Sequence, residues 1–330
     1  MRNSRSICAK RGLLGTGVAC ALAAASAGVQ AQAYPTKPIR MIVGFAPGGG
    51  TDTTARAISA KLGELVGQQV IIDNRAGAAG NIATELVAKA NPDGYTLLLG
   101  TIAALAINPS LYRSKLPFDP VKDFAPVIQV VDSTNILSVH PSVPANTVKE
   151  IIALAKSRTL NYGSSGVGGT GHLAGELFDT MAGVKMTHVP YKGGGPAMID
   201  LVGGQVQLVY ATAASAVPQI KAGKIKGIAV TTIKRSALMP SIPTIAESGL
   251  PGFDANNWYG LLLPAQTPRA IVMRLNAEVT KVLAMPDVKD FLFNQGLDPA
   301  PGTPEQFGTY IKSEIAKWAK VVKDSGARAD

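Results

Sequence analysis

Two glycine-rich segments carry the groups in this chain that could bind an anion. The first is Phe45–Asp52, with the sequence FAPGGGTD, and the second is Gly163–His172, with the sequence GSSGVGGTGH. Each follows a short apolar run and precedes a helical pattern, so each predicts a turn at the start of a helix. Such a turn exposes backbone N–H groups and the positive end of the helix dipole, and glycine lets a ligand approach closely. Together the two turns predict a cleft that holds a small anion from both sides.

Hydroxyl side chains strengthen this interpretation. Thr51 or Asp52 can cap the first helix, and Ser164, Ser165 and Thr170 add hydroxyl donors to the second turn. A third strand-to-helix turn follows at Tyr191-Lys192-Gly193. Asp52 is favoured as a helix cap over a direct anion ligand, because a carboxylate repels an anion.

Several motifs that would indicate an enzyme are incomplete. The segment 166–171 fits G-x-G-x-x-G, but the acidic residue expected about 20 positions later for a dinucleotide ribose is missing. Gly50 stands where a phosphate loop needs its lysine, and Val167 breaks a G-x-S-x-G pattern. The three histidines have no metal-ligand spacing. We therefore expect no catalytic residue, no cofactor and no metal.

The N-terminal segment indicates export. A basic start, an apolar run and the small residues Ala31-Gln32-Ala33 predict a cleaved signal peptide over residues 1–33 and a periplasmic protein. Its removal takes four cations and both cysteines, so the net charge falls from +10 to +6 and no disulfide can form. The remaining cations are scattered, which argues against nucleic-acid binding and favours attraction of small anions. We expect a monomer.

The elements that would position these turns alternate between strand and helix, which predicts an α/β fold with mainly parallel sheets flanked by helices. We predict two lobes, each with one such sheet. The first is discontinuous, residues 34–130 and 230–330, and the second is residues 131–229. The helical stripes of the C-terminal third, at 271–282 and 307–322, are expected to pack on the first lobe. Two crossings of the chain between the lobes predict a hinge.

Many motifs, in order along the chain, resemble those of one family. They include Tyr34–Ile39, the first glycine turn, Asn74–Gly80, Asn91–Leu97, Ile107–Tyr112, Asp123–Val127, Gly171–Glu176, His188–Gly193 and Trp258–Leu261. This set is similar to the Bug-type, TctC-like periplasmic substrate-binding proteins of tripartite tricarboxylate transporters. The resemblance implies a two-lobed, flytrap-like fold that binds a small organic carboxylate, partly through water, and delivers it to membrane permease subunits.

The resemblance also implies specific carboxylate contacts. On the first lobe these are Phe45, Ala46, Gly49, Thr51 and Asp52, and on the second they are Ser164, Gly166, Thr170 and His172. We expect Thr101, Tyr191, Tyr210 and Ala211 to complete the ligand site. Relatives often have Phe-Asp-Asn where this chain has Tyr210-Ala211-Thr212. Because Ala211 cannot pair with an ammonium group, we expect di-, tri- or aromatic carboxylates rather than amino acids.

Two other functions remain open on the sequence. The chain could be a sensory co-receptor whose closed form engages a membrane kinase, in which case ligand binding would persist but uptake would not depend on it. It could also be a secreted hydrolase, in which case replacing Ser164 or Ser165 would abolish ester cleavage.

Overall fold

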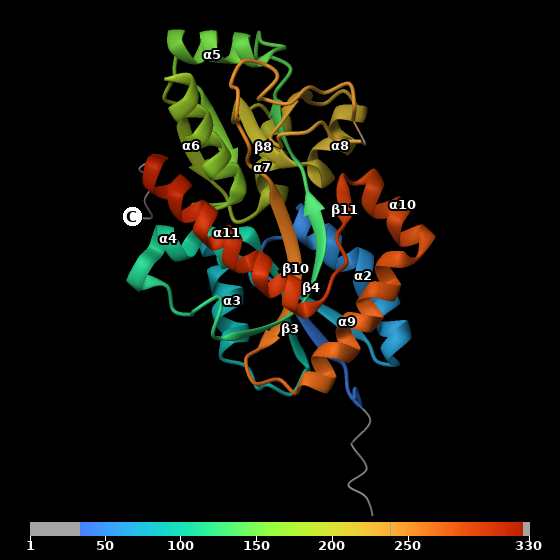
Figure 1. Cartoon of the computed structure of the whole chain (residues 1–330). Helices are drawn as coiled ribbons and strands as arrows, with labels where there is room; N and C mark the ends of the chain where they lie inside the picture. The colour runs from blue at the N-terminus through green and yellow to red at the C-terminus, as the bar shows by residue number, and fades with distance from the viewer. Residues whose placement is uncertain (1–33, 238, 326–330) are drawn as a thin grey trace, which may run out of the picture.

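Two β-sheets, one above the other, form the frame of the molecule (Figure 1). The computed structural model describes residues 34–237 and 239–325. The expected signal peptide, 1–33, and the last five residues of the expected first lobe lie outside this range.

The first sheet has six strands in the order β11-β4-β10-β3-β1-β2. The strands β1 and β2 are parallel, as are β1 and β3, but β10 runs antiparallel to both β3 and β4. β11 is antiparallel to β4. The bounds are β1 Ile39–Val43, β2 Val70–Asn74, β3 Thr96–Thr101, β4 Phe124–Ser133, β10 Asn257–Pro264 and β11 Leu297–Pro299.

The second sheet has five strands in the order β7-β6-β8-β5-β9. β6 is parallel to β7 and to β8, whereas β5 is antiparallel to β8 and β9. The two-lobed α/β fold is therefore confirmed, with mixed sheets in place of mainly parallel ones. The bounds are β5 Asn135–Val139, β6 Asn161–Ser164, β7 Thr187–Pro190, β8 Leu208–Thr212 and β9 Lys226–Val230.

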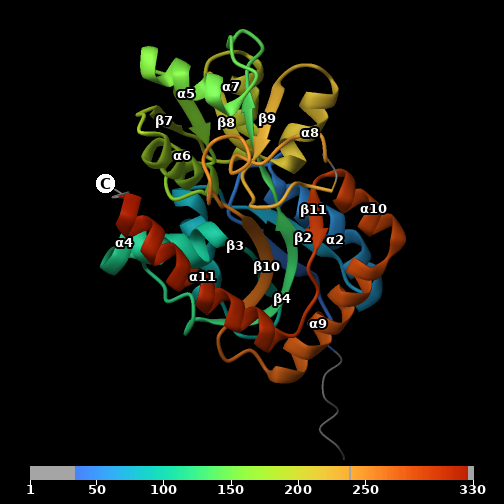
Figure 2. The ribbon, with the colours of Figure 1, turned by 45° about the horizontal axis from the view of Figure 1, so that its top comes forward.

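Helices cover both faces of each sheet (Figures 1 and 2). On the first sheet α2, α9 and α10 pack against one face, and α3, α11 and a buried π-helical turn at Ala103–Ile107 pack against the other. On the second sheet α5 and α6 lie opposite α7 and α8. The helix bounds are α2 Gly50–Val66, α3 Asn81–Ala88, α4 Asn108–Tyr112, α5 Val148–Ser157, α6 Thr170–Ala182, α7 Gly194–Val202, α8 Ala213–Lys221, α9 Arg269–Ala284, α10 Pro286–Asn294 and α11 Pro304–Ser325, with short 3₁₀ turns at Ala78–Gly80 and Arg113–Lys115.

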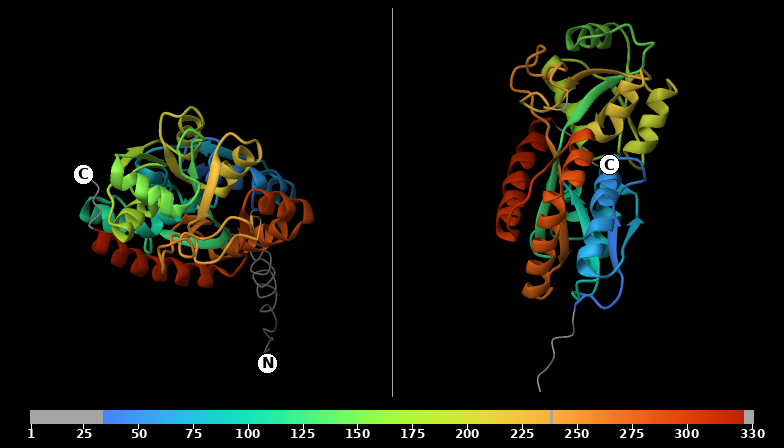
Figure 3. Two further views of the ribbon diagram at one scale, coloured as in Figure 1. Left: turned by 90° about the horizontal axis from the view of Figure 1, so that it is seen from above. Right: turned by 90° about the vertical axis from the view of Figure 1, so that its right-hand side faces the viewer.

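The chain passes from one sheet to the other twice. The first passage is at Thr134, between β4 and β5, and the second lies between the end of β9 at Val230 and the start of β10 at Asn257. The side view in Figure 3 shows the elongated shape that results. The lobe boundaries expected from the sequence remain predictions.

The long helix α11 ties the lobes together on one face. It packs on β4 and on the π-helical turn, and it also contacts α6 of the other lobe. Glu314 of α11 is 5% exposed. Its carboxylate accepts hydrogen bonds from the indole N–H groups of Trp258 and Trp318, each at 3.2 Å. Lys317 Nζ lies 3.8 Å from the other oxygen of this carboxylate, so two indole donors and one ammonium group stabilise the buried side chain.

We expect Glu314→Ala to lower the free energy of unfolding by about 2–4 kcal/mol, since it leaves two buried indole donors without an acceptor. Urea unfolding followed by fluorescence measures this loss, and the two tryptophans are the only ones in the chain. Glu305→Ala, which removes an exposed carboxylate from the same helix, should cost much less stability than Glu314→Ala. Equal losses in the two variants would contradict this account of the packing.

Candidate anion-binding site

A small cavity lies where the two glycine turns meet. Its volume is about 40 Å³. It receives side chains and backbone from both lobes, at the ends of strands and the beginnings of helices. The lining residues are Phe45, Gly49, Gly50, Thr51, Thr101, Ala103, Ser165, Thr170, Gly194, Thr212, Asn257 and Tyr259.

Four helices begin at this cavity. The first residues of α2, α6 and α7 line it, as does Thr212, the N-cap of α8. The caps are Gly49, Gly169, Gly193 and Thr212, and none of them makes a side-chain capping hydrogen bond. The first N–H groups of each helix therefore lack an intrahelical acceptor and a side-chain cap. In α8 the N–H of Ala213 donates to the Thr134 carbonyl oxygen at 2.8 Å, so the free donors are those of α2, α6 and α7. Each helix start also carries roughly half a positive charge from its dipole.

The positive potential of this cavity comes from the backbone. Among the described residues that line it, none has a charged side chain. Thr101, whose buried Oγ1 has no hydrogen-bond partner in the described part of the chain, adds a free hydroxyl. Buried hydroxyls normally have partners, so this one indicates a group that accepts or donates from within the cavity.

Two further lining side chains come from β10. Asn257 and Tyr259 point to the same side of the strand, and the Asn257 amide donates to the Tyr259 hydroxyl at 3.0 Å. A Cβ atom on Gly50 would lie 2.8 Å from that hydroxyl and 3.0 Å from Thr212 Oγ1, so glycine is needed at the start of α2. Burial raises the pKa of Tyr259, which stays a neutral hydroxyl.

Asp52 is directed toward its own turn. Its carboxylate accepts hydrogen bonds from the Gly48 N–H at 3.2 Å, from Arg56 at 2.9 and 3.1 Å, and from Asn74 at 3.1 Å. Asn74 also donates to the carbonyl oxygen of Phe45 at 2.9 Å. Burial opposes ionisation, but these hydrogen bonds outweigh it and hold the pKa of Asp52 below its usual range. In this structure Asp52 shapes the first turn and does not line the cavity.

Ser164 and His172 lie behind the second turn. Ser164, 1% exposed, accepts from the Gly166 N–H at 3.1 Å. His172 Nδ1 accepts from the Gly168 N–H at 3.2 Å. These side chains therefore hold the turn from the side away from the cavity.

The remaining sequence-predicted residues lie outside the cavity lining. Ala46 donates its N–H to the Lys192 carbonyl, and Tyr191 donates its hydroxyl to Asp200 at 2.7 Å. Tyr210 is buried beside Tyr162 and Phe178, whereas Ala211 packs on the opposite face of β8. Of the predicted set, the cavity brings together Phe45, Gly49, Thr51, Thr101 and Thr170. Direct contact of the whole set with a ligand remains a prediction.

The sequence reasoning missed several lining residues. For Asn257 and Tyr259 the available signal was the continuous, mainly apolar run at 258–263, which is consistent with a fully buried strand. For Thr212 it was the polar residue between an apolar run and a helical pattern. The residues not expected at the site are Ala103, Gly194, Thr212, Asn257 and Tyr259, whereas Gly50 and Ser165 belong to the two predicted glycine turns.

Backbone contacts between the lobes close one side of the cavity. The Ala46 N–H donates to the Lys192 carbonyl oxygen at 3.1 Å. A Cβ atom on Gly195 would lie 2.4 Å from the carbonyl oxygen of Pro47, and one on Gly193 would lie 2.9 Å from the nitrogen of Ala46. The first turn and the third turn thus meet through glycine, and side chains there would hold the lobes apart.

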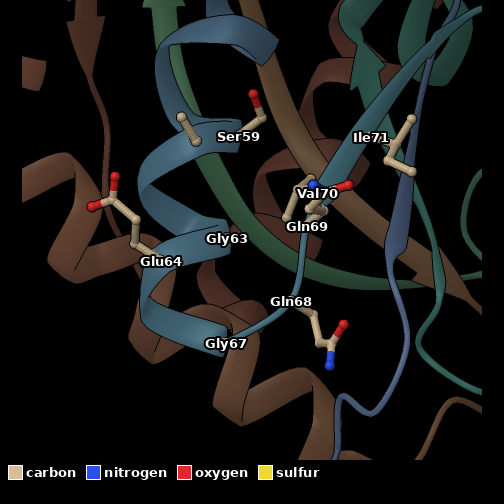
Figure 4. A pocket seen from close by; sticks show the side chains of 9 residues that line it. Ser59, Gly63, Glu64, Gly67, Gln68, Gln69, Val70 and Ile71 are labelled. Carbon is tan, nitrogen blue, oxygen red and sulfur yellow. The ribbon is translucent and has the colours of Figure 1, made fainter.

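A larger groove lies elsewhere, at the C-terminal end of α2 beside the edge strand β2 (Figure 4). Its volume is about 520 Å³. The last carbonyl groups of α2 and the side chain of Glu64 make this end of the helix negative, so the groove does not suit an anion. The described residues contain no group of three or more potential metal ligands and no helix long and apolar enough to cross a membrane.

A family profile and a known relative both match this chain over most of its length. The sequence profile of the tripartite tricarboxylate transporter family receptors matches residues 54–327. Protein BugT of Bordetella pertussis is 37% identical over 315 residues, which is 94% of this chain and 96% of that protein.

Solved structures are similar over the whole fold. R. palustris Rpa4515, solved with adipate, is 42% identical with a TM-score of 0.87 and covers 89% of this chain and 99% of its own. MatC of Rhodopseudomonas palustris, solved with bound malate, is 34% identical with a TM-score of 0.84 and covers 88% and 100%. The periplasmic binding protein BugD is 33% identical with a TM-score of 0.86, covering 90% and 100%.

For the first turn we expect Asp52→Asn to lower the free energy of unfolding by about 1–3 kcal/mol at pH 7, because charge-assisted hydrogen bonds are lost. The folded pKa of Asp52 lies below the unfolded value, so its contribution is present above about pH 4 and is lost as pH falls through the folded pKa. The difference in the free energy of unfolding between wild type and Asp52→Asn, measured by urea unfolding, should therefore be smaller at pH 3 than at pH 7. Glu64→Gln, on the exposed side of α2, should change stability by less than about 0.5 kcal/mol at either pH. If Asp52→Asn has the same free energy of unfolding as wild type at pH 7, the turn holds its shape without this carboxylate.

Proposed function

Since the chain belongs to the tripartite tricarboxylate transporter receptor family, we propose that it captures a small organic carboxylate between its lobes in the periplasm and delivers it to membrane permease subunits. The protein acts as a binding component and not as an enzyme. Adipate and malate, found in two similar structures, indicate the chemical class of ligand.

The observation that carries this proposal is the meeting of four helix N-termini at one cavity without a charged side chain. Free N–H groups and helix dipoles favour an anion. An anion held in this way needs no lysine or arginine. The hydroxyls of Thr51, Thr101 and Tyr259 add neutral donors that fit carboxylate oxygens.

The same lining argues against amino acids as ligands. Recognition of an ammonium group calls for a carboxylate or several acceptors. No Asp or Glu is among the described residues around the cavity, and the nearest acidic side chain of the first turn, Asp52, is occupied by Arg56 and Asn74. Position 211, where an acidic residue could serve, is a buried alanine. We therefore assign the second end of the ligand to another carboxylate or to a hydroxyl.

Binding would work by closure of the two lobes. The passages at Thr134 and between β9 and β10 allow rotation, and the glycine contacts between the first and third turns form when the lobes meet. A ligand that touches N–H groups of both lobes stabilises the closed form and shifts the population toward it. Water molecules between ligand and backbone would let one scaffold accept acids of different length.

The hydrolase alternative has one supporting feature, the 2.6 Å distance between Ser164 Oγ and His188 Nε2. Ser164 is 1% exposed and does not line the cavity, so its hydroxyl lacks a path to a substrate. Ser165 does line the cavity, but none of the described lining residues is a histidine that could act as its base. We therefore retain the binding function.

Isothermal titration calorimetry tests this function. We expect adipate or malate to bind at one site, and aspartate and glutamate to give no heat. At 100 times its Kd the bound acid should add about 2.7 kcal/mol to the free energy of unfolding. Thr101→Val, which removes a hydroxyl from the cavity, should weaken binding by about 10–100-fold, as expected for a hydrogen bond to a charged group. Tight aspartate binding, or no binding by any carboxylate of a mono-, di- and tricarboxylate panel, would refute the proposal.

We expect Gly195→Ala to prevent full closure, because its Cβ atom would lie 2.4 Å from the Pro47 carbonyl oxygen. Small-angle X-ray scattering with saturating adipate should give a larger radius of gyration than wild type, and the Kd should rise at least tenfold. Gly308→Ala, on α11 and outside the cavity lining, is the control, since its Cβ atom would lie 3.5 Å from its nearest neighbour, Pro126, which is an ordinary contact. It should close as wild type does. Identical scattering for both variants would show that the third turn does not limit closure.

A further inference from the structure

Two stacked histidines lie directly behind the second glycine turn. His172 is in the first turn of α6 and His188 is in β7, and their ring centroids are 4.2 Å apart with an interplanar angle of 26°. His172 is 6% exposed. Tyr162 of β6 stacks on His188 at 5.0 Å, so the rings form a continuous column in the interior of the lobe.

Each imidazole is bound to the turn. His172 Nδ1 accepts from the Gly168 N–H at 3.2 Å. His188 Nε2 lies 2.6 Å from Ser164 Oγ, which itself accepts from the Gly166 N–H at 3.1 Å. Between these two attachments the chain places Ser165, and just after them Thr170, at the cavity. The column therefore fixes the shape of the segment that would grip the ligand.

This arrangement requires a neutral His172. An imidazole nitrogen accepts a hydrogen bond only when it carries no proton, so the Gly168 contact places the proton of His172 on Nε2. That nitrogen faces Glu176 Oε1 at 3.6 Å. A proton added to Nδ1 would turn the acceptor into a donor that faces the Gly168 N–H. Protonation of both rings would also set two positive charges against each other.

The surroundings favour the neutral form. Burial lowers the pKa of His172, with Glu176 opposing, and burial together with His172 lowers the pKa of His188 to about 3. The Tyr162 hydroxyl donates to Glu176 at 2.9 Å, which engages the carboxylate nearest to the column. Other titratable groups near the column are Asp179 on α6, Lys185 just after that helix, and Tyr210 on β8.

We propose that His172 and His188 are positioning residues for carboxylate binding, whose neutral stack holds the second glycine turn in its gripping shape and makes affinity fall on acidification. This inference rests on the proposed function and names a regulation of the same site. It assigns His172 to the support of the turn and not to contact with the ligand.

The experiment compares Kd values for adipate between pH 7.5 and pH 4 in wild type and three variants, because burial moves protonation of the column to acidic pH. In His172→Asn the side-chain oxygen takes the place of Nδ1 as acceptor and cannot be protonated in this range. Its Kd at pH 7.5 should lie within about threefold of wild type, and the ratio of wild-type Kd to variant Kd should rise at least fivefold by pH 4. Adipate titrates identically with both proteins, so the ratio isolates the histidine. His172→Leu, without an acceptor, should bind at least tenfold more weakly at both pH values, with its fold checked by circular dichroism.

His140→Asn is the matched control. His140 lies in an exposed turn where its ring contacts Ser142, far from the cavity in sequence and fold, so this variant should follow wild type at every pH. A constant ratio of wild-type to His172→Asn Kd values across the range, or wild-type affinity in His172→Leu, would overturn the inference.

A measurement without ligand separates this inference from the proposed function. The chain has three histidines, so their ring signals can be assigned by NMR from single variants. In wild type the Gly168 amide shift should follow the titration of the His172 ring, and in His172→Asn it should stay constant. If no carboxylate binds but the Gly168 amide behaves in this way, the proposed function fails and the support of the turn stands. If the Gly168 amide shift does not change when His172 is protonated, the inference is refuted even if adipate binds.

Discussion

Unpaired backbone N–H groups at the starts of helices give this structure its selectivity for an anion. The first N–H groups of any helix lack an intrahelical acceptor and need one from a side chain, from water or from a ligand. Here α2, α6, α7 and α8 all begin at one cavity, and three of their four caps are glycine. The Thr134 carbonyl oxygen accepts from the first N–H of α8, so the unpaired donors belong to the three helices with glycine caps. Four positive dipole ends facing one another are unfavourable in an enclosed space. An anion between them removes that conflict, which explains how a cavity without lysine or arginine can select negative charge.

Glycine serves a second purpose, since it lets backbones meet. Gly50 makes room for the Tyr259 hydroxyl beside the start of α2, and Gly195 lets α7 approach the carbonyl of Pro47 across the lobes. Such turns have little stiffness of their own, so each has a support behind it. Asp52, with Arg56 and Asn74, holds the first turn, and Ser164 with the two histidines holds the second. The residues that would contact the ligand and the residues that hold the turns in shape are therefore distinct.

The sequence predicted the two turns, the α/β class and five of the residues that line the cavity, because a glycine-rich turn between an apolar run and a helical pattern is a local signal. Strand direction is not local. The run at 257–264 was not recognised as β10, and its antiparallel place between β3 and β4 makes the first sheet mixed. Asn257 and Tyr259 were missed with it. The buried π-helical turn at Ala103–Ile107 was also missed, because so short an apolar segment shows no clear periodicity and its burial depends on packing against α11.

The direct test of the backbone clamp is a crystal structure of the chain with adipate at a resolution that shows ordered water. We expect a carboxylate of adipate between the starts of α2 and α6, accepting hydrogen bonds from their backbone N–H groups directly or through water, without contact to any lysine or arginine. A carboxylate held by a cationic side chain, or bound in the groove beside β2, would contradict the account.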